Sequence, residues 1–336
     1  MVRGLERYEA INRNEAAAKF QVAKRLEAEI VEGLEAMKDE HDRLKREFRK
    51  LLAESDAGIL KESEADYSFL HLKRDMLYEM LKSCNFCERR CGVNRFEKKG
   101  FCKCGVTSYF SSEFLHFGEE PELVPSHTIF FNRCTFACVF CQNYDIVYDD
   151  DYIAEPKELA YLIDVRRRQG SRNVNFVGGN PDQHAHTIVE TLIYVKSNIP
   201  VVWNSNMYHS SELAEVIEDV VDVWLGDFKY GNDECAMKYS KVPRYWEVVT
   251  RNFLRAKDNG ELLIRHLVMP NHIDCCTAKI VRWVAENLGR DVRFNLMFQY
   301  YPTFRAWDYP EISRRLSLEE MRRAEKIAKE YLTNLV

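Results

Sequence analysis

Strand-like and helix-like segments alternate along the last two thirds of the chain, and this alternation constrains the fold more than any other feature. Short apolar runs rich in β-branched and aromatic residues recur at 128–133, 173–177, 200–203, 223–227, 262–269 and 292–298. Longer segments of helical character lie between them. Such alternation places the strands in parallel, joined by right-handed helical crossovers. We therefore predict an α/β fold, either an open sheet or a (β/α) barrel, with chemistry at the carboxyl ends of the strands.

The distribution of the 11 cysteines divides the chain. Residues 1–82 contain none, whereas eight lie between Cys84 and Cys141. We predict a helical arm over 1–82, a cysteine-rich metal-binding connector over 83–125, a partial barrel over 126–316 and a C-terminal helix over 317–336. The chain begins with charged residues and has no apolar run long enough for a membrane span. We expect a cytoplasmic protein, in which clustered cysteines indicate metal or catalysis rather than disulfides.

The first 82 residues have a helical composition, with 34 of them charged and neither Trp nor Pro among them. Apolar residues spaced by three and four form a stripe from Phe20 to Leu51. A break is expected at Asp56-Ala57-Gly58, followed by a second helix that folds back. Two interpretations remain open: a helical hairpin packed on its own domain, or a coiled-coil arm that docks a second chain or a protein substrate. The net charge of −5 argues against nucleic acid as the partner.

The first strand of the alternating region leads directly into three closely spaced cysteines, Cys134, Cys138 and Cys141. Three thiolates on one short loop can hold three corners of a cubane iron–sulfur cluster. The fourth iron then lacks a protein ligand and is free to bind a small molecule, as an open position does at a catalytic metal. A zinc knuckle is the alternative for such a loop.

The spacing Cys-x3-Cys-x-aromatic-Cys after the first strand resembles the signature of the radical S-adenosylmethionine (SAM) superfamily. The likeness continues at later strand ends, over about residues 84–316. The segments that carry it are Gly178-Gly179-Asn180-Pro181, Trp203-Asn204-Ser205-Asn206, Gly226-Asp227-Phe228-Lys229 and Arg265-His266-Leu267-Val268-Met269-Pro270. The last two are similar to segments of glycyl-radical-enzyme activases. The group that the chain most resembles is the PflX-type branch of pyruvate formate-lyase-activating-enzyme-like proteins.

The resemblance implies a partial (β/α)6 TIM-like barrel that holds a [4Fe-4S] cluster on Cys134, Cys138 and Cys141. It also implies SAM contacts, in which the Asn180 carbonyl accepts from the amino group and Lys229 pairs with the carboxylate. The full set of expected SAM-binding residues is Phe140, Gly178, Gly179, Asn180, Asn204, Asn206, Asp227, Lys229, Arg265 and Gln299. Two of these depart from the family, because Asn180 replaces the usual Glu and Gln299 stands near the usual place of a ribose-contacting His.

The implied activity is reductive cleavage of SAM to a 5′-deoxyadenosyl radical, which abstracts hydrogen from a substrate, with a protein substrate suggested by the activases. The cofactor supplies that chemistry and the barrel directs it. A reducing electron donor of the ferredoxin or flavodoxin type is expected. Radical modification of another peptide, an RNA or a metabolite is one alternative. A non-catalytic iron–sulfur electron carrier or scaffold is the other.

The connector carries a second set of cysteines, Cys84, Cys87, Cys91 and Cys102, with Cys104 spare. Four thiolates suit an auxiliary [4Fe-4S] cluster or a structural zinc ion equally well by ligand type. The single Cys-x2-Cys pair favours the cluster over zinc, which usually takes two such pairs. Cys275 and Cys276, which follow the fifth strand, are interpreted as packing residues in preference to catalytic ones. Cys235 is left without a role.

Overall fold

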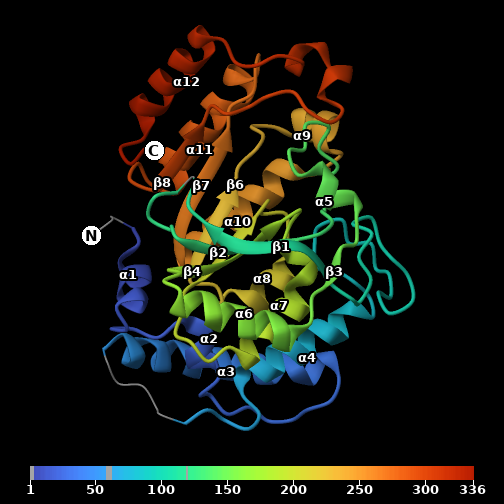
Figure 1. The fold of residues 1–336 in the computed structure, drawn as a ribbon, viewed down its shortest axis with the longest axis vertical. Coiled ribbons are helices and arrows are strands. Elements are labelled where there is room, and N and C mark those ends of the chain that lie inside the picture. Colours follow the sequence, from blue (N-terminus) through green and yellow to red (C-terminus); the bar gives the residue numbers. More distant parts are fainter. Residues whose placement is uncertain (1–3, 58–62, 119) are drawn as a thin grey trace.

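The computed structural model describes residues 4–57, 63–118 and 120–336, and it contains one eight-stranded, mostly parallel sheet (Figure 1). Its strands are β1 (Tyr109–His116), β2 (Ser126–Phe131), β3 (Tyr152–Ile153), β4 (Asn173–Gly178), β5 (Val201–Ser205), β6 (Val223–Asp227), β7 (Glu261–Leu267) and β8 (Arg293–Met297). The order across the sheet is β3-β1-β2-β4-β5-β6-β7-β8. From β2 to β8 every neighbouring pair is parallel, and β1 is antiparallel to both of its neighbours.

The six parallel strands match the six predicted apolar runs, so the predicted α/β alternation is confirmed. Their backbones are covered on both faces, and β5 is buried at every residue. The intervening helices are α5 (Tyr144–Tyr148), α6 (Pro156–Arg168), α7 (Ala185–Tyr194), α8 (Ser211–Ile217), α9 (Asp233–Ser240), α10 (Tyr245–Asn259), α11 (Ala278–Asn287) and α12 (Leu318–Tyr331). Short helical turns lie at Asp182–His184, Ile273–Thr277, Ala306–Asp308 and Pro310–Ile312. Strand β1 lies within the predicted connector and was not expected, because polar and half-exposed residues fill its middle.

The sheet is open, because β8 and β3 occupy its two edges and do not pair. The connection between β1 and β2 nevertheless reaches the β8 edge. Glu122 is ion-paired with Arg293 on β8, and Glu120 Oε1 accepts a hydrogen bond of 3.0 Å from Asn295 Nδ2. These contacts require the sheet to curve so that β2 and β8 approach one another, which gathers the carboxyl ends of the strands around one space.

The N-terminal residues form α1 (Glu6–Asn12), α2 (Lys19–Ala23), α3 (Leu34–Asp56) and α4 (Phe69–Leu81). Helix α3 packs on α4, which packs on α7 and α8 (Figure 1). At this contact the buried Lys73 Nζ lies 3.0 Å from Asp219 Oδ2 and donates to the Val216 carbonyl. The arm therefore shares the core of the sheet domain, as in the packed-hairpin interpretation. Coiled-coil pairing with a second chain stays a prediction.

The predicted apolar stripe is not one helix. Its members on α3 are buried, but residues 24–33 between α2 and α3 are not helical, and Ile30 is 78% exposed. The backbone of Gly33 has φ of 85°, a conformation that favours glycine, and α3 begins after it. At the other end α3 stops at Asp56, as expected, while Gly58 lies outside the described residues. Within the described chain, no helix combines the length and hydropathy needed to cross a lipid bilayer.

Candidate active site

The loop that follows β2 carries Cys134, Cys138 and Cys141, and all three side chains line one pocket at the carboxyl ends of the strands. Other residues expected at the site come from the ends of β4, β5, β6 and β7. Those that line the same pocket are Phe140, Gly178, Gly179, Asn180, Asn204, Asn206, Asp227, Lys229 and Arg265. Gln299 is absent from the lining and is exposed.

Hydrogen-bond donors point at the sulfurs of the cysteine loop. Ser240 Oγ lies 2.8 Å from Cys138 Sγ, and the Phe136 amide lies 3.3 Å from Cys134 Sγ. The Asn206 side-chain amide reaches Cys134 Sγ at 3.8 Å. Hydrogen bonds to sulfur stabilise thiolates and tune iron–sulfur clusters. The donors therefore fit sulfurs that carry negative charge as metal ligands.

The metal-free thiols are held in the protonated form. Burial raises the pKa of Cys134 and Cys138, and burial together with the neighbouring Cys138 raises the pKa of Cys141 to about 12. Three half-buried thiols close together resist ionisation because each thiolate would repel the next. A bound metal centre removes this penalty by replacing the protons. The donor set and its surroundings thus fit a three-thiolate iron–sulfur cluster.

Gly178 and Gly179, at the end of β4, touch the backbone that leads into the cysteine loop. A Cβ on Gly178 would stand 2.2 Å from the Phe131 carbonyl oxygen, and one on Gly179 would stand 1.7 Å from the Arg133 carbonyl oxygen. The Gly179 amide donates to the Phe131 carbonyl at 2.8 Å. Both glycines are thus required for packing against the loop, a role that the sequence motif alone does not reveal.

Asn180 and Asn206 hold the site together through hydrogen bonds. The Asn180 Oδ1 accepts from the Asn206 amide at 3.0 Å, and the Asn206 Nδ2 donates to Thr135 Oγ1 at 2.9 Å. This chain of bonds ties the ends of β4 and β5 to the cysteine loop. Because the Asn180 carbonyl already has a donor, its expected contact with the SAM amino group stays a prediction.

Charged side chains line the opposite wall of the pocket. Lys229 Nζ lies 2.6 Å from Asp227 Oδ2, and Arg265 Nε lies 3.7 Å from Asp227 Oδ1 and 3.5 Å from Glu120 Oε1. Burial would raise the pKa of Asp227, but Lys229 and Arg265 outweigh it and hold that pKa below its usual value. Burial likewise opposes the charge of Lys229, yet Asp227 and Cys138 raise the pKa of Lys229 overall. Lys229 and Arg265 thus face the pocket together with two carboxylates, Asp227 between the two cations and Glu120 beside Arg265.

Phe140, expected beside an adenine, is only 6% exposed and packs edge-on against Tyr230 and Tyr300. Several other residues contribute to the site and were not predicted, among them the apolar lining residues Phe136, Val177 and Leu267. Gln142 and Asn143 line the pocket directly after Cys141, and their place next to the motif was an available signal. Met297 ends β8 and could have been found by the strand-end rule. Ser240 had no signal in the sequence.

The connector cysteines lie beside this site. The backbone of the connector is hydrogen-bonded to the segment after β5, since the Glu88 amide donates to the Tyr208 carbonyl at 3.2 Å. Arg89 Nε donates to the Thr135 carbonyl in the cysteine loop at 2.7 Å. Burial raises the pKa of Cys84 and Cys87, and the charges of Cys91 and Cys102 act in the same direction on both. The four predicted ligands of the connector are therefore mutual neighbours.

A sequence profile described as the radical SAM superfamily matches residues 128–284, which span the cysteine loop and most of the sheet. Along its whole length the chain is also 47% identical to an uncharacterised protein of Methanocaldococcus jannaschii, MJ0674, over 343 residues and 99% of each chain. Residues 128–284 form a radical SAM superfamily domain. Radical SAM proteins carry a [4Fe-4S] cluster and bind SAM, so the family assignment implies both cofactors. It also implies an enzyme of the radical SAM type.

Solved structures similar to this radical SAM protein are more distant. SuiB of Streptococcus suis bound to S-adenosylmethionine is 15% identical, with a TM-score of 0.44 over 60% of this chain and 47% of SuiB. The maturase HydG is 12% identical, with a TM-score of 0.44 over 97% of this chain and 66% of HydG. Methylornithine synthase, PylB, is 12% identical, with a TM-score of 0.42 over 98% of this chain and 77% of that protein. The chain thus spans less than half of the length of SuiB.

Proposed function

We propose that Cys134, Cys138 and Cys141 hold a [4Fe-4S] cluster, that the adjoining pocket binds SAM, and that the protein modifies a protein substrate, as a glycyl-radical activase does. One observation carries the proposal: side chains from the ends of five successive parallel strands line the pocket into which the three thiols point. When bound, the reduced cluster supplies the electron that cleaves SAM into methionine and a 5′-deoxyadenosyl radical, which takes hydrogen from the substrate.

The chain's own residues bind and orient SAM in this proposal. Lys229 and Arg265 attract the methionine carboxylate, and Asp227 holds both cations in place. Asn204 adds a polar side chain to the lining of the same pocket. Phe140, held by two tyrosines, presents an apolar edge for the adenine. Gln299 is left out of this set because it lies away from the pocket.

The activase assignment is supported by the Asp-x-Lys pair and by Arg265, Val268 and Pro270, which stand in the same order in that group. Strand β7 places Arg265 within reach of Asp227, so the two motifs act in one site. We propose that the substrate enters over the β1–β2 connection, because a second cavity lined by His116, Glu120 and Thr128 shares Asn204 and Arg265 with the pocket. A partial barrel, with its gap at this connection, is the shape we infer.

We propose that Cys84, Cys87, Cys91 and Cys102 hold an auxiliary [4Fe-4S] cluster. A tetrahedral zinc ion with Zn–S bonds of about 2.3 Å places its sulfurs about 3.8 Å apart. No three of these four sulfurs lie within 4.8 Å of one another in the described structure, which supports the wider spacing of a cluster. Arg89 connects this connector to the cysteine loop, so electrons from a ferredoxin or flavodoxin could pass from one cluster to the other.

The proposal is tested by anaerobic reconstitution with iron and sulfide, followed by dithionite and SAM. Equal amounts of 5′-deoxyadenosine and methionine are expected, and the Cys138→Ser variant is expected to form neither. A SAM-induced change in the EPR signal of the reduced cluster gives a second readout. An assembled cluster that neither responds to SAM nor yields these products would instead identify an electron carrier or scaffold.

A further inference from the structure

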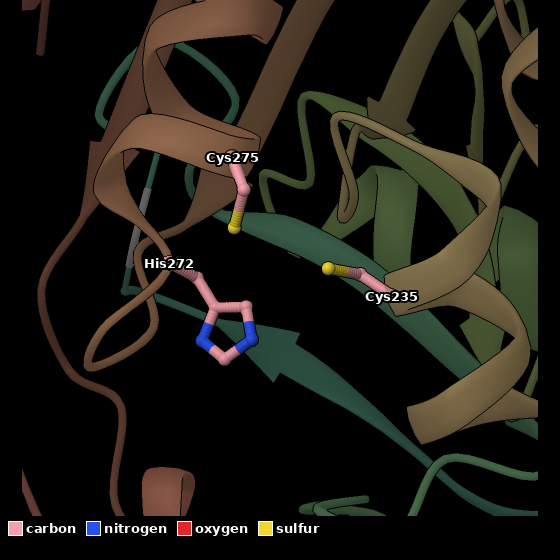
Figure 2. A group of neighbouring side chains, drawn as sticks. All are labelled: Cys235, His272 and Cys275. Carbon is pink, nitrogen blue, oxygen red and sulfur yellow. The ribbon is translucent and has the colours of Figure 1, made fainter.

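Two cysteines and a histidine meet outside the pocket described above (Figure 2). Cys235 lies in α9, His272 in the loop after β7, and Cys275 in the π-helical turn Ile273–Thr277. One ligand atom from each, the two sulfurs and a ring nitrogen, lie within 4.8 Å of one another. Figure 2 shows the three side chains pointing toward a common centre from two separate elements. No other such trio of Cys, His, Asp or Glu occurs within the described part of the chain.

The histidine ring is oriented as a metal ligand. His272 Nδ1 lies 2.6 Å from the Pro270 carbonyl oxygen. A carbonyl only accepts hydrogen bonds, so Nδ1 carries the proton and the neutral ring keeps the lone pair of Nε2 free. Metal-binding histidines characteristically donate their second nitrogen to a backbone carbonyl or carboxylate in this way. The ring is also buried, with its edge against Tyr239.

The backbones of the two cysteines are held by hydrogen bonds to one side chain. Asn232 Oδ1 accepts from the Cys235 amide at 2.8 Å, and Asn232 Nδ2 donates to the Cys275 carbonyl at 2.9 Å. One side chain therefore fixes the backbone of both cysteines.

We propose that Cys235 Sγ, Cys275 Sγ and His272 Nε2 bind a divalent metal ion of the zinc class. Two thiolates and one imidazole are ligands that zinc prefers. The fourth position is open to water or to Cys276, whose sulfur lies 3.9 Å from that of Cys275. This ion is separate from the proposed radical chemistry, and nothing in the SAM pocket supplies its ligands.

The ion would join two loops of the candidate active site. Gly231 lies against the turn that carries the cysteines, since a Cβ there would stand 2.6 Å from the Cys275 carbonyl oxygen. Lys229 lies two residues before Gly231. His272 lies in the loop after β7, the strand that carries Arg265. A metal ion bound by Cys235, His272 and Cys275 therefore fixes the loop that carries Lys229 to the loop that follows the strand of Arg265.

The direct test measures metal content. The full-length protein is loaded anaerobically with Zn²⁺ under reducing conditions, freed of excess metal, and analysed for zinc and iron. We compare wild type with Cys235→Ser and His272→Gln, and use the Cys84→Ala/Cys87→Ala double variant as the matched control. About one zinc per chain is expected in wild type and in the control, with a loss of most of it in both trio variants.

Zinc that persists in Cys235→Ser but disappears in the Cys84→Ala/Cys87→Ala control would overturn the proposal, because the connector would then be its site. A Co²⁺ titration of the wild type covers the case in which a trio variant fails to fold. Thiolate-to-cobalt charge-transfer bands and the visible bands of tetrahedral cobalt are expected. Their absence in reduced protein, or a Cys235–Cys275 disulfide that persists under reduction, would equally overturn it. These readouts do not depend on SAM cleavage.

Discussion

Gly178 on β4 pairs with Phe131 on β2, and the two backbones approach so closely that any side chain at Gly178 would collide with the Phe131 carbonyl. Gly178 also has φ of 111°, which glycine adopts readily. Phe131 is two residues before Arg133, which enters the cysteine loop. The strand pairing therefore determines where the loop starts.

We expect Gly178→Ala to destabilise the protein and to impair cluster loading. Gly170 is the matched control, because it has φ of 98° but open space where a Cβ would stand. Gly170→Ala should lower the free energy of unfolding by about 1–2 kcal/mol through its backbone alone. Gly178→Ala should cost about 1–3 kcal/mol more through overpacking. Urea denaturation and iron content measure both effects, and equal losses in the two variants would contradict the packing role.

Replacing Lys229 by Met should weaken the pocket and change its response to acid. The lowered pKa of Asp227 stabilises the fold above the ordinary carboxyl pKa of about 4, and this contribution is lost as pH falls through the folded value. Without Lys229 the pKa of Asp227 rises and the stabilisation shrinks. Since the pair is about a quarter exposed, we expect a loss of about 1–3 kcal/mol at pH 7, less than for a fully buried pair.

Denaturation of wild type and Lys229→Met across pH 3 to 7 checks this prediction. The difference between them should shrink toward the acid end, because the stabilisation from ionised Asp227 is progressively lost as the pH falls below the ordinary carboxyl pKa. Lys238→Met serves as the control, because Lys238 forms its ion pair with Glu311 on the surface. A difference that stays constant with pH would show that Lys229 stabilises the fold by packing alone.

The Ser240 hydroxyl donates to Cys138 Sγ at 2.8 Å, so its removal should lower the reduction potential of the cluster. A hydrogen bond to a ligand sulfur favours the reduced state, which carries more negative charge. Ser240→Ala should therefore require a stronger reductant, while Ser313→Ala, away from the pocket, should not. A redox titration followed by EPR compares them. An unchanged potential in Ser240→Ala, with the cluster fully loaded, would rule out this tuning.

The sequence was sufficient to predict the six parallel strands, because buried parallel strands are uniformly apolar. It also predicted that the cysteine loop and the ends of four further strands meet, since parallel topology alone brings strand ends together. It could not predict which polar atoms already have partners. Asn180 resembles a ligand-binding residue by position, yet its carbonyl accepts from Asn206.

Long-range contacts account for the rest. Phe20 and Leu51 share one apolar spacing, but Gly33 interrupts the helix between them, and a spacing rule does not detect a break that tertiary packing decides. Cys235 and Cys275 are 40 residues apart; Cys275 was interpreted as a packing residue, and Cys235 was left without a role. Only the folded chain shows that Cys235 meets His272 and Cys275.

Lys73 should be essential for docking the arm. It is fully buried and ion-paired with Asp219 on the far side of the contact with α8. Lys73→Ala leaves that carboxylate buried without its cation, which should cost about 3–5 kcal/mol. Lys82→Ala, at the exposed end of the same helix, should change the free energy of unfolding by less than about 1 kcal/mol. Denaturation midpoints distinguish these outcomes, and similar values would mean that the arm docks without this pair.

The connector cysteines give the sharpest prediction about electron flow. If Cys84 and Cys87 hold part of an auxiliary [4Fe-4S] cluster, the Cys84→Ala/Cys87→Ala variant should lose half of its iron after reconstitution and keep the EPR signal of the SAM-responsive cluster. Because Arg89 links the connector to Thr135 in the cysteine loop, reduction by a protein donor should slow, while reduction by dithionite should not. A variant that keeps all its iron but loses zinc would show a structural zinc ion, and electrons would then reach the cysteine loop by another route.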